Sequence, residues 1–390
     1  MTATALSPAR SGSVSRAFLL VVLVLTVLAN VAALVADVAS RTFLNPYNAT
    51  QYYLTWQDGF FRRGFPGTLL HLVMGRDPTL AELSVVTAVA TVLGLVATGV
   101  FVAAVARLPA FAGSEAIVLT LLVASPLTFS MVLHNRSRLD PVVVLLVVLL
   151  ALLPARVLSA RWLSSVLAAG LAAAAVGSLE FAVGFVAPVL LARALREPGG
   201  RTRWVRLALE LAPAAAMAAA SLLLRPSAAT LDRVEERFTR AGIAAPRENS
   251  VSVLTNTVPE ALGLNRDHLL LTRVLWFAVF AACFAVTVHL LRQVARAGAF
   301  ETRPVAAFLV CCAATAGLVS IVGFDYGRWF SLALLALGAS VLVLQGRPTS
   351  PLSTLARTDR PLPRRTEVLL GVVLVVSLVG QQFPVYPAWG

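Results

Sequence analysis

Four short strings combine ionisable residues with glycine or aromatic residues in a chain that is otherwise mostly apolar. They are WQDGFFRRG at residues 56–64, HNRSRLD at 134–140, SLE at 178–180 and GFDYGRW at 323–329. A carboxylate can remove a proton from a reacting hydroxyl group, and a guanidinium can bind phosphate oxygens through two parallel hydrogen bonds. These residue types could supply a general base and a binding site for phosphate oxygens.

The first string places an acid close to two bases. Asp58 precedes Gly59 and is followed by Arg62 and Arg63, so it could act as a general base beside a pair of phosphate-binding guanidinium groups. The alternative is a turn in which an ion pair anchors an interfacial helix. Both interpretations stay open from the sequence.

The second string offers a titratable group and positive charge near the end of an apolar run. Its candidate residues for substrate binding are His134, Arg136, Arg138 and Asp140. Helix ends commonly carry such residues, and an Asp before Pro141 is also typical of a helix N-cap followed by proline at the first helical position.

The last two strings add three further candidates. Glu180 interrupts an apolar stretch, where a charged carboxylate is costly unless it faces a wet cavity or a cationic partner. A buried ion pair with an Arg is therefore the alternative to a binding role. Asp325 and Arg328 are three residues apart, so they could bind a ligand or form an ion pair within one helical turn.

The elements that position these residues are predicted from hydropathy. The chain has 390 residues, 58% hydrophobic and 13% charged, with a mean hydropathy of +0.83, whereas soluble domains carry about 25% charged residues. Apolar runs of membrane-spanning length favour helices, because lipid cannot satisfy backbone hydrogen bonds. We expect an all-α fold, a polytopic integral membrane bundle of about eleven transmembrane helices forming a single domain over residues 1–390. The predicted spans are 17–38, 83–106, 115–133, 141–155, 162–179, 181–195, 205–224, 270–291, 305–323, 329–345 and 366–381.

The distribution of Arg predicts the orientation. Arg-rich connections such as residues 193–206 and 346–365 fall on one side, which the positive-inside rule assigns to the cytoplasm. We therefore expect a multi-pass protein of the cytoplasmic (inner) membrane, with the N-terminus inside, the C-terminus outside and all four strings at the outer face. The net charge of +13 is dispersed among these connections, which argues against nucleic-acid binding.

Two connections are too long to be simple turns. The first outer loop, residues 40–82, contains an apolar stretch at 67–74 that is too short to span and should lie at the interface. The outer loop at 225–268 contains residues 230–241, whose Leu231, Val234 and Phe238 share one face of a predicted amphipathic helix. No zinc-ligand spacing or nucleotide-binding loop is evident, so no metal ligands are predicted.

This arrangement of a long outer loop carrying an acid, an interfacial helix and many further spans resembles the GT-C superfamily of membrane glycosyltransferases. The strings at residues 58–64 and 325–329 also resemble those of bacterial polytopic proteins associated with surface polysaccharides. The resemblance implies a polyprenyl-phosphate sugar as donor, a cell-envelope glycan or lipid as acceptor, and Asp58 as the catalytic residue. Because Gly59 rather than a second acid follows Asp58, a divalent cation as cofactor stays an open question.

The resemblance implies a mechanism in which Asp58 deprotonates the acceptor hydroxyl group while Arg62, Arg63 or Arg138 neutralises the departing phosphate. Three alternatives stay open. A polymerase or ligase of lipid-linked oligosaccharides would depend mainly on His134, Arg136 and Arg138. A transporter or flippase would use Glu180, although transporters usually place such groups near the membrane midplane. A scaffold of an envelope assembly would need no single charge.

Overall fold

The computed structural model describes residues 46–60, 62–106, 138–154, 161–196, 200–243 and 326–345, together with residue 278 and scattered positions between 21 and 44. Every secondary-structure element in these ranges is a helix, as the all-α prediction requires. The predicted spans 17–38, 115–133, 270–291, 305–323 and 366–381 lie wholly or largely outside the described residues.

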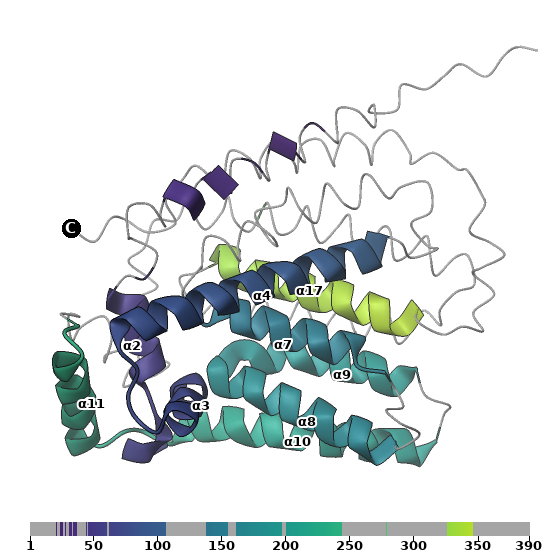
Figure 1. The fold of residues 1–390 in the computed structure, drawn as a ribbon. Helices are drawn as coiled ribbons and strands as arrows, with labels where there is room; N and C mark the ends of the chain where they lie inside the picture. Colours follow the sequence, from purple (N-terminus) through teal and green to yellow (C-terminus); the bar gives the residue numbers. More distant parts are fainter. Residues whose placement is uncertain are drawn as a thin grey trace, which may run out of the picture.

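Six long helices run side by side and coincide with predicted spans (Figure 1). They are α4 (Leu80–Ala106), α7 (Asp140–Leu152), α8 (Arg161–Ser178), α9 (Val183–Leu195), α10 (Arg201–Leu223) and α17 (Tyr326–Gln345). One boundary differs in a way that matters for the candidate residues. Since α17 begins at Tyr326, Arg328 lies within the helix and not in the connection where the span prediction left it.

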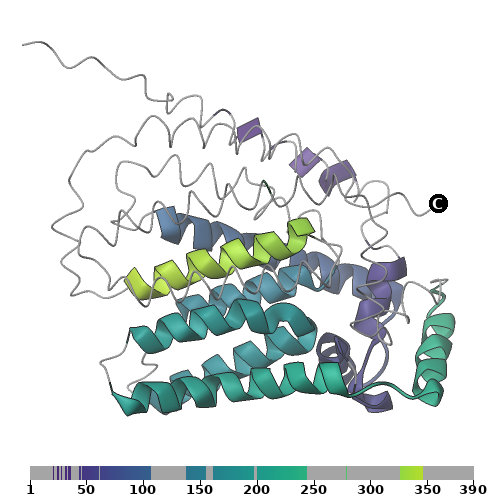
Figure 2. The same ribbon diagram turned by 180° about the vertical axis from the view of Figure 1, so that it is seen from behind.

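The connections fix which helix ends lie together. Ser164 near the start of α8 donates a hydrogen bond to the carbonyl of Pro154, just beyond α7, so α8 returns beside α7. The short 3-10 helix η3 (Glu180–Ala182) then reverses the chain into α9. The start of α7, the end of α8, the start of α9 and the end of α10 consequently meet at one end of the bundle (Figure 2).

That end is covered by four short elements, which we call the cap. They are α2 (Pro46–Tyr53), η1 (Trp56–Asp58), α3 (Gly64–Met74) and α11 (Ala228–Arg240). The first three come from the predicted first outer loop and α11 from the predicted loop at 225–268, so segments far apart in sequence lie together (Figure 1). The interfacial stretch predicted at 67–74 forms the later part of α3.

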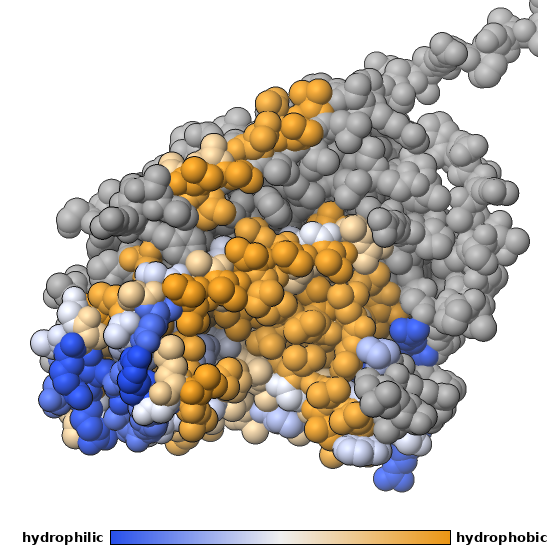
Figure 3. Space-filling view, viewed as in Figure 1, coloured by the Kyte–Doolittle hydropathy of each residue, from blue (hydrophilic) through white to orange (hydrophobic). Residues whose placement is uncertain are grey.

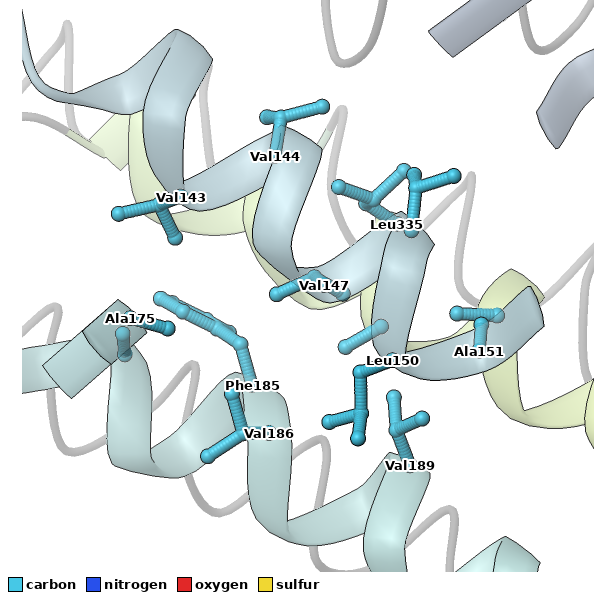
Figure 4. Close-up of a cluster of buried hydrophobic side chains, with 14 of the residues drawn as sticks. Val143, Val144, Val147, Leu150, Ala151, Ala175, Phe185, Val186, Val189 and Leu335 are labelled. Carbon is cyan, nitrogen blue, oxygen red and sulfur yellow. The ribbon is translucent and has the colours of Figure 1, made fainter. Parts of the chain in front are cut away.

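The main hydrophobic core lies between the long helices. Val143, Val147 and Leu150 of α7 are fully buried and face Phe185 of α9 and Leu335 of α17 (Figure 4). Small residues recur on the buried face of α8, which packs closely on α10. Small side chains let helix backbones approach each other and are typical of helix contacts within membranes.

A second hydrophobic cluster holds the cap together. Leu231, Val234 and Phe238 of α11 are buried against α2, where the rings of Tyr53 and Phe238 lie edge to face at 6.4 Å between centroids. The predicted amphipathic helix is thus present. Its apolar face contacts the protein, which makes α11 an integral part of the cap.

The outside of the bundle is strongly apolar. Along α4 the exposed positions Val85, Val89, Val92 and Val96 form a continuous stripe, and the surface over α4 is hydrophobic while hydrophilic residues gather over the cap (Figure 3). Among the described residues, α4 over Leu80–Ala104 and α10 are long and apolar enough to cross a bilayer. Only 17% of the apolar window of α10 is buried, unlike the core helix of a soluble protein. These two helices indicate association with a membrane.

Candidate functional site

The string at residues 56–64 folds tightly over the end of α8. The Trp56 ring stacks on Phe60 at 5.3 Å between centroids and contacts Phe65, while its backbone N–H donates to Oγ1 of Thr68 at 2.8 Å. Gly177 of α8 lies directly beneath, because a Cβ atom there would stand 2.9 Å from Cβ of Phe65. This contact brings the first outer loop to the connection that carries Glu180.

Glu180 forms a buried ion pair with Arg63. Arg63 precedes α3 with φ of 64°, a left-handed conformation, and donates from Nε to Oε2 at 3.1 Å and from Nη2 to Oε1 at 3.0 Å. Glu180 is 4% exposed, and Nη1 of Arg62 lies 3.9 Å from the same carboxylate. The ion-pair interpretation of Glu180 is therefore confirmed, with a partner from the first outer loop.

Positive charge exceeds negative charge around this pair. Burial raises the pKa of the Glu180 carboxyl, but the charge and hydrogen bonds of Arg63 and the charge of Arg62 outweigh it and lower the pKa to about 2. Burial lowers the pKa of the Arg62 guanidinium; Glu180 opposes that shift, while Arg63 and Arg225 add to it. Two guanidinium groups thus act on the Glu180 carboxylate and Arg225 acts on Arg62, and this arrangement favours a bound anion.

Asp58 is paired with different bases from those that the sequence suggested. Its Oδ2 lies 2.9 Å from Nη2 of Arg237 and its Oδ1 lies 3.7 Å from Nε of Arg233, both on α11. The backbone carbonyl of Asp58 also accepts hydrogen bonds from Thr230 and Arg233, each at 3.2 Å. The predicted pairing of Asp58 with Arg62 and Arg63 is wrong in this respect, since those bases face Glu180.

Arg237 joins the two loops that the sequence predicts to lie outside. In addition to its contact with Asp58, Arg237 places its Nε 3.2 Å from Oδ2 of Asp77. Nη1 of Arg237 donates hydrogen bonds to the carbonyl of Tyr53 at 3.1 Å and to Oγ1 of Thr55 at 2.7 Å. Asp77 in turn contacts Nδ1 of His71 at 3.1 Å. One largely buried guanidinium therefore holds η1, the end of α2 and the start of α4 against α11.

The Asp58 carboxylate is held in a fixed position. Its Oδ2 is buried beside the Arg237 guanidinium, at 2.9 Å from Nη2. The side chain as a whole is 11% exposed. A carboxylate that is fixed in place can accept a proton from a hydroxyl group that reaches it.

Arg138 and Asp140 lie at the same end of the bundle and serve different contacts. Nε of Arg138 donates to Oδ1 of Asn48 at 3.3 Å and its guanidinium stands 5.7 Å from the ring centroid of Tyr47, while its carbonyl accepts from Tyr52 at 3.0 Å. Asp140 is fully buried in the first turn of α7, where Leu139 and not Asp140 stands at the N-cap position.

The remaining candidates cannot be joined to this set. His134, Arg136 and Asp325 lie outside the described residues, and of Arg328 the structure describes only the helical backbone. Val343 near the end of α17 lines a pocket with Ala151 and Ala194, at the bundle end opposite the cap, so α17 begins toward the cap. The described part of the chain contains no cluster of His, Cys, Asp and Glu that could hold a metal ion.

Sequence reasoning missed Arg225, Arg233, Arg237 and Asp77. A signal for two of them was present, because Arg233 and Arg237 are four residues apart on the polar face of a predicted helix. The partner of that face could not be read from spacing, since Asp58 lies in another loop. We found no family model, no curated protein and no solved structure that matches this chain.

Proposed function

We propose that this protein is a GT-C-like glycosyltransferase that moves a sugar from a polyprenyl-phosphate donor to a cell-envelope acceptor at the outer face of the cytoplasmic membrane. The observation that carries the proposal is the segment at residues 56–64. It bears a carboxylate held in place at Asp58 and, beside Glu180, the arginine pair Arg62 and Arg63.

The two chemical groups lie within reach of one substrate. Asp58 and Arg62 are four residues apart, so their Cα atoms are separated by no more than about 14 Å. In the proposed reaction the donor and acceptor bridge these two groups, with the acceptor hydroxyl at Asp58 and the phosphate at Arg62. The segment can therefore address the acceptor hydroxyl and the leaving phosphate together.

In the proposed reaction, Asp58 accepts the proton of the acceptor hydroxyl as its oxygen forms a bond to the anomeric carbon. The bond between that carbon and the phosphate oxygen breaks, and its electron pair leaves with the polyprenyl phosphate. Arg62, together with Arg63 beside Glu180 and with Arg225 beside Arg62, stabilises the negative charge that develops on this phosphate. Arg237 keeps the Asp58 carboxylate in place.

The proposal includes the membrane arrangement. About eleven spans, with the N-terminus in the cytoplasm, would place the cap outside, where lipid-linked sugars are used. The exposed apolar residues Leu69, Leu72 and Val73 of α3 support contact of the cap with lipid, since they stand directly after the Arg62 and Arg63 pair. A donor with its isoprenoid tail in the bilayer would present its phosphate at this level.

The decisive experiment compares two acids that contact the same guanidinium. Asp58 and Asp77 both pair with Arg237, but only Asp58 belongs to the proposed catalytic segment. Full-length wild type, Asp58→Asn and Asp77→Asn are reconstituted in liposomes with radiolabelled polyprenyl-phosphate sugars, tested one sugar at a time with membrane lipid extract as acceptor. Folding is checked by size-exclusion profile and thermal unfolding.

We expect Asp58→Asn to reduce transfer by at least about 100-fold, the scale of a lost general base. Asp77→Asn should retain most of the activity. Equal losses in the two folded variants would mean that Asp58 only holds Arg237, and absence of transfer by the wild type from every donor would refute the proposed function. If Arg138→Gln, and not Asp58→Asn, abolishes the activity, the polymerase or ligase alternative is correct.

A further inference from the structure

A second charged site lies at the end of the bundle opposite the cap. A pocket there is lined by Arg193 and Arg196 at the end of α9 and by Arg206 and Glu210 in the first half of α10, with Ala151, Leu153, Leu207 and Val343 among its apolar walls. None of these residues takes part in the proposed reaction. The pocket is therefore separate from the proposed reaction, and its place on the cytoplasmic side rests on the membrane arrangement proposed above.

Arg193 is a buried residue that lines this pocket. It is 8% exposed and donates from Nη1 to the carbonyl of Leu153 at 2.6 Å and from Nη2 to Oγ of Ser164 at 2.9 Å. These bonds satisfy carbonyl groups at the end of α7, which would otherwise lack donors. Arg193 is thus bound to the scaffold and contributes a fixed positive charge.

The described lining of the pocket holds three bases and one acid. Glu210 is 2% exposed; its Oε1 accepts from Nε of Arg206 at 2.7 Å and its Oε2 lies 4.0 Å from Nε of Arg193. Arg196 also lines the pocket, where it stands at the C-terminal end of α9. Among the described lining residues, basic side chains outnumber acidic ones, which suits an anion.

Two exposed tryptophans mark the level of this pocket relative to lipid. Trp162 begins α8 and is 69% exposed, and Trp204 lies in the first turn of α10 and is 45% exposed. Both helices begin at the pocket end of the bundle. Exposed tryptophan at the ends of apolar helices is typical of the boundary between lipid headgroups and hydrocarbon, so the pocket lies at headgroup depth.

We propose that this pocket binds the phosphate of an anionic phospholipid headgroup, with Arg196 and Arg206 as the phosphate ligands. Basic pockets between helices on the cytoplasmic side of a membrane are suited to such headgroups. The apolar wall formed by Leu153, Leu207 and Val343 fits the glycerol end of the lipid, which a free phosphate would leave uncovered. The bound lipid would fasten α9 to α10 at this face.

The test measures the binding of lipid to the full-length protein. Protein freed of lipid in a neutral detergent is titrated with phosphatidylglycerol, with phosphatidylcholine and with inorganic phosphate, and bound lipid is counted by native mass spectrometry. We expect one phosphatidylglycerol to bind, phosphatidylcholine to bind at least tenfold more weakly, and inorganic phosphate at equal concentration not to displace the lipid. Displacement by inorganic phosphate would overturn the lipid assignment in favour of a soluble phosphate ligand.

Variants separate the pocket from general electrostatic attraction. Arg206→Gln and Arg196→Gln should each weaken phosphatidylglycerol binding by about tenfold, the effect of one lost charged hydrogen bond. Arg201→Gln removes the same charge from the same connection without altering a lining residue, and it should change binding by less than about twofold. If Arg206→Gln does not fold, the comparison of lipid binding between Arg196→Gln and Arg201→Gln still tests the proposal. Equal weakening by Arg196→Gln and Arg201→Gln would overturn the proposal.

Discussion

Replacing Glu180 with Gln probes the contact between the first outer loop and the helical bundle. The substitution keeps the shape of the side chain and removes its charge, so Arg63 loses one of two charged hydrogen bonds and Arg62 loses its nearby counter-charge. The carboxylate is 4% exposed, and water cannot replace the lost partner. We expect the substitution to destabilise the junction of cap and bundle.

The size of the expected loss of unfolding free energy follows from the burial of the Glu180 ion pair. Removing one partner of a buried ion pair costs about 3 to 5 kcal/mol, because the remaining charge is left uncompensated, whereas an exposed pair contributes about 0.2 to 1 kcal/mol. The amide oxygen of Gln can still accept one hydrogen bond from Arg63. We therefore expect a loss near the lower limit, about 3 kcal/mol of unfolding free energy.

The assay is reversible unfolding of the purified protein in mixed micelles, with a double-mutant cycle. The cycle compares Glu180→Gln, Arg63→Met and the double variant, since a direct pair gives non-additive effects. We expect the double variant to be more stable than the sum of the single losses predicts, because it leaves no unpaired charge at this position. A loss below about 1 kcal/mol together with additive effects would refute the buried pair.

Three further predictions follow from the same contacts. Arg237→Met should lower the unfolding free energy by about 3 to 5 kcal/mol and speed amide hydrogen exchange in α11, since it removes the buried guanidinium that joins the outer loops; unchanged exchange in α11 would contradict this. Gly67→Ala should lower the unfolding free energy by about 1 to 3 kcal/mol, because a Cβ atom there would overlap the backbone carbonyl of Leu54. Gly170 faces open space, so Gly170→Ala should instead stabilise α8 by about 0.5 to 1 kcal/mol in the same unfolding assay. The pKa of Glu180 is lowered from 4.5 to about 2, so the stabilisation by its carboxylate is complete above pH 4.5 and is lost as the pH falls toward 2. The unfolding free energy of the wild type should therefore decrease over this pH range by an amount that the Glu180→Gln variant does not show.

Hydropathy predicted the helices well and their ends less well. The break at Glu180 correctly separated α8 from α9, because an acid in an apolar run needs a connection or a partner. At α17, by contrast, the polar residues near Tyr326 were assigned to a connection although they continue the helix. Helix ends depend on capping and on local packing, and both are weaker signals than a long apolar run.

The sequence predicted that the candidate residues lie together but not how they pair. Asp58, Arg62 and Arg63 were selected as an acid close to two bases, and Glu180 because charge is costly in an apolar stretch; all four lie at one end of the bundle. Spacing suggested that Asp58 would pair with its nearest bases. The pairing is instead set by tertiary packing, which brings Arg237 from a distant loop to Asp58.

Sidedness is the most direct test of the account, because the proposed reaction requires the cap outside and the Arg206 pocket inside. Single cysteines are placed at Arg233, which is 54% exposed in the cap, and at Arg201, at the opposite end, after Cys283, Cys311 and Cys312 are replaced by alanine. Intact spheroplasts are then treated with a membrane-impermeant maleimide. We predict labelling of Arg233→Cys in intact cells and of Arg201→Cys only after permeabilisation; labelling of both from the same side would contradict a bundle that crosses the membrane.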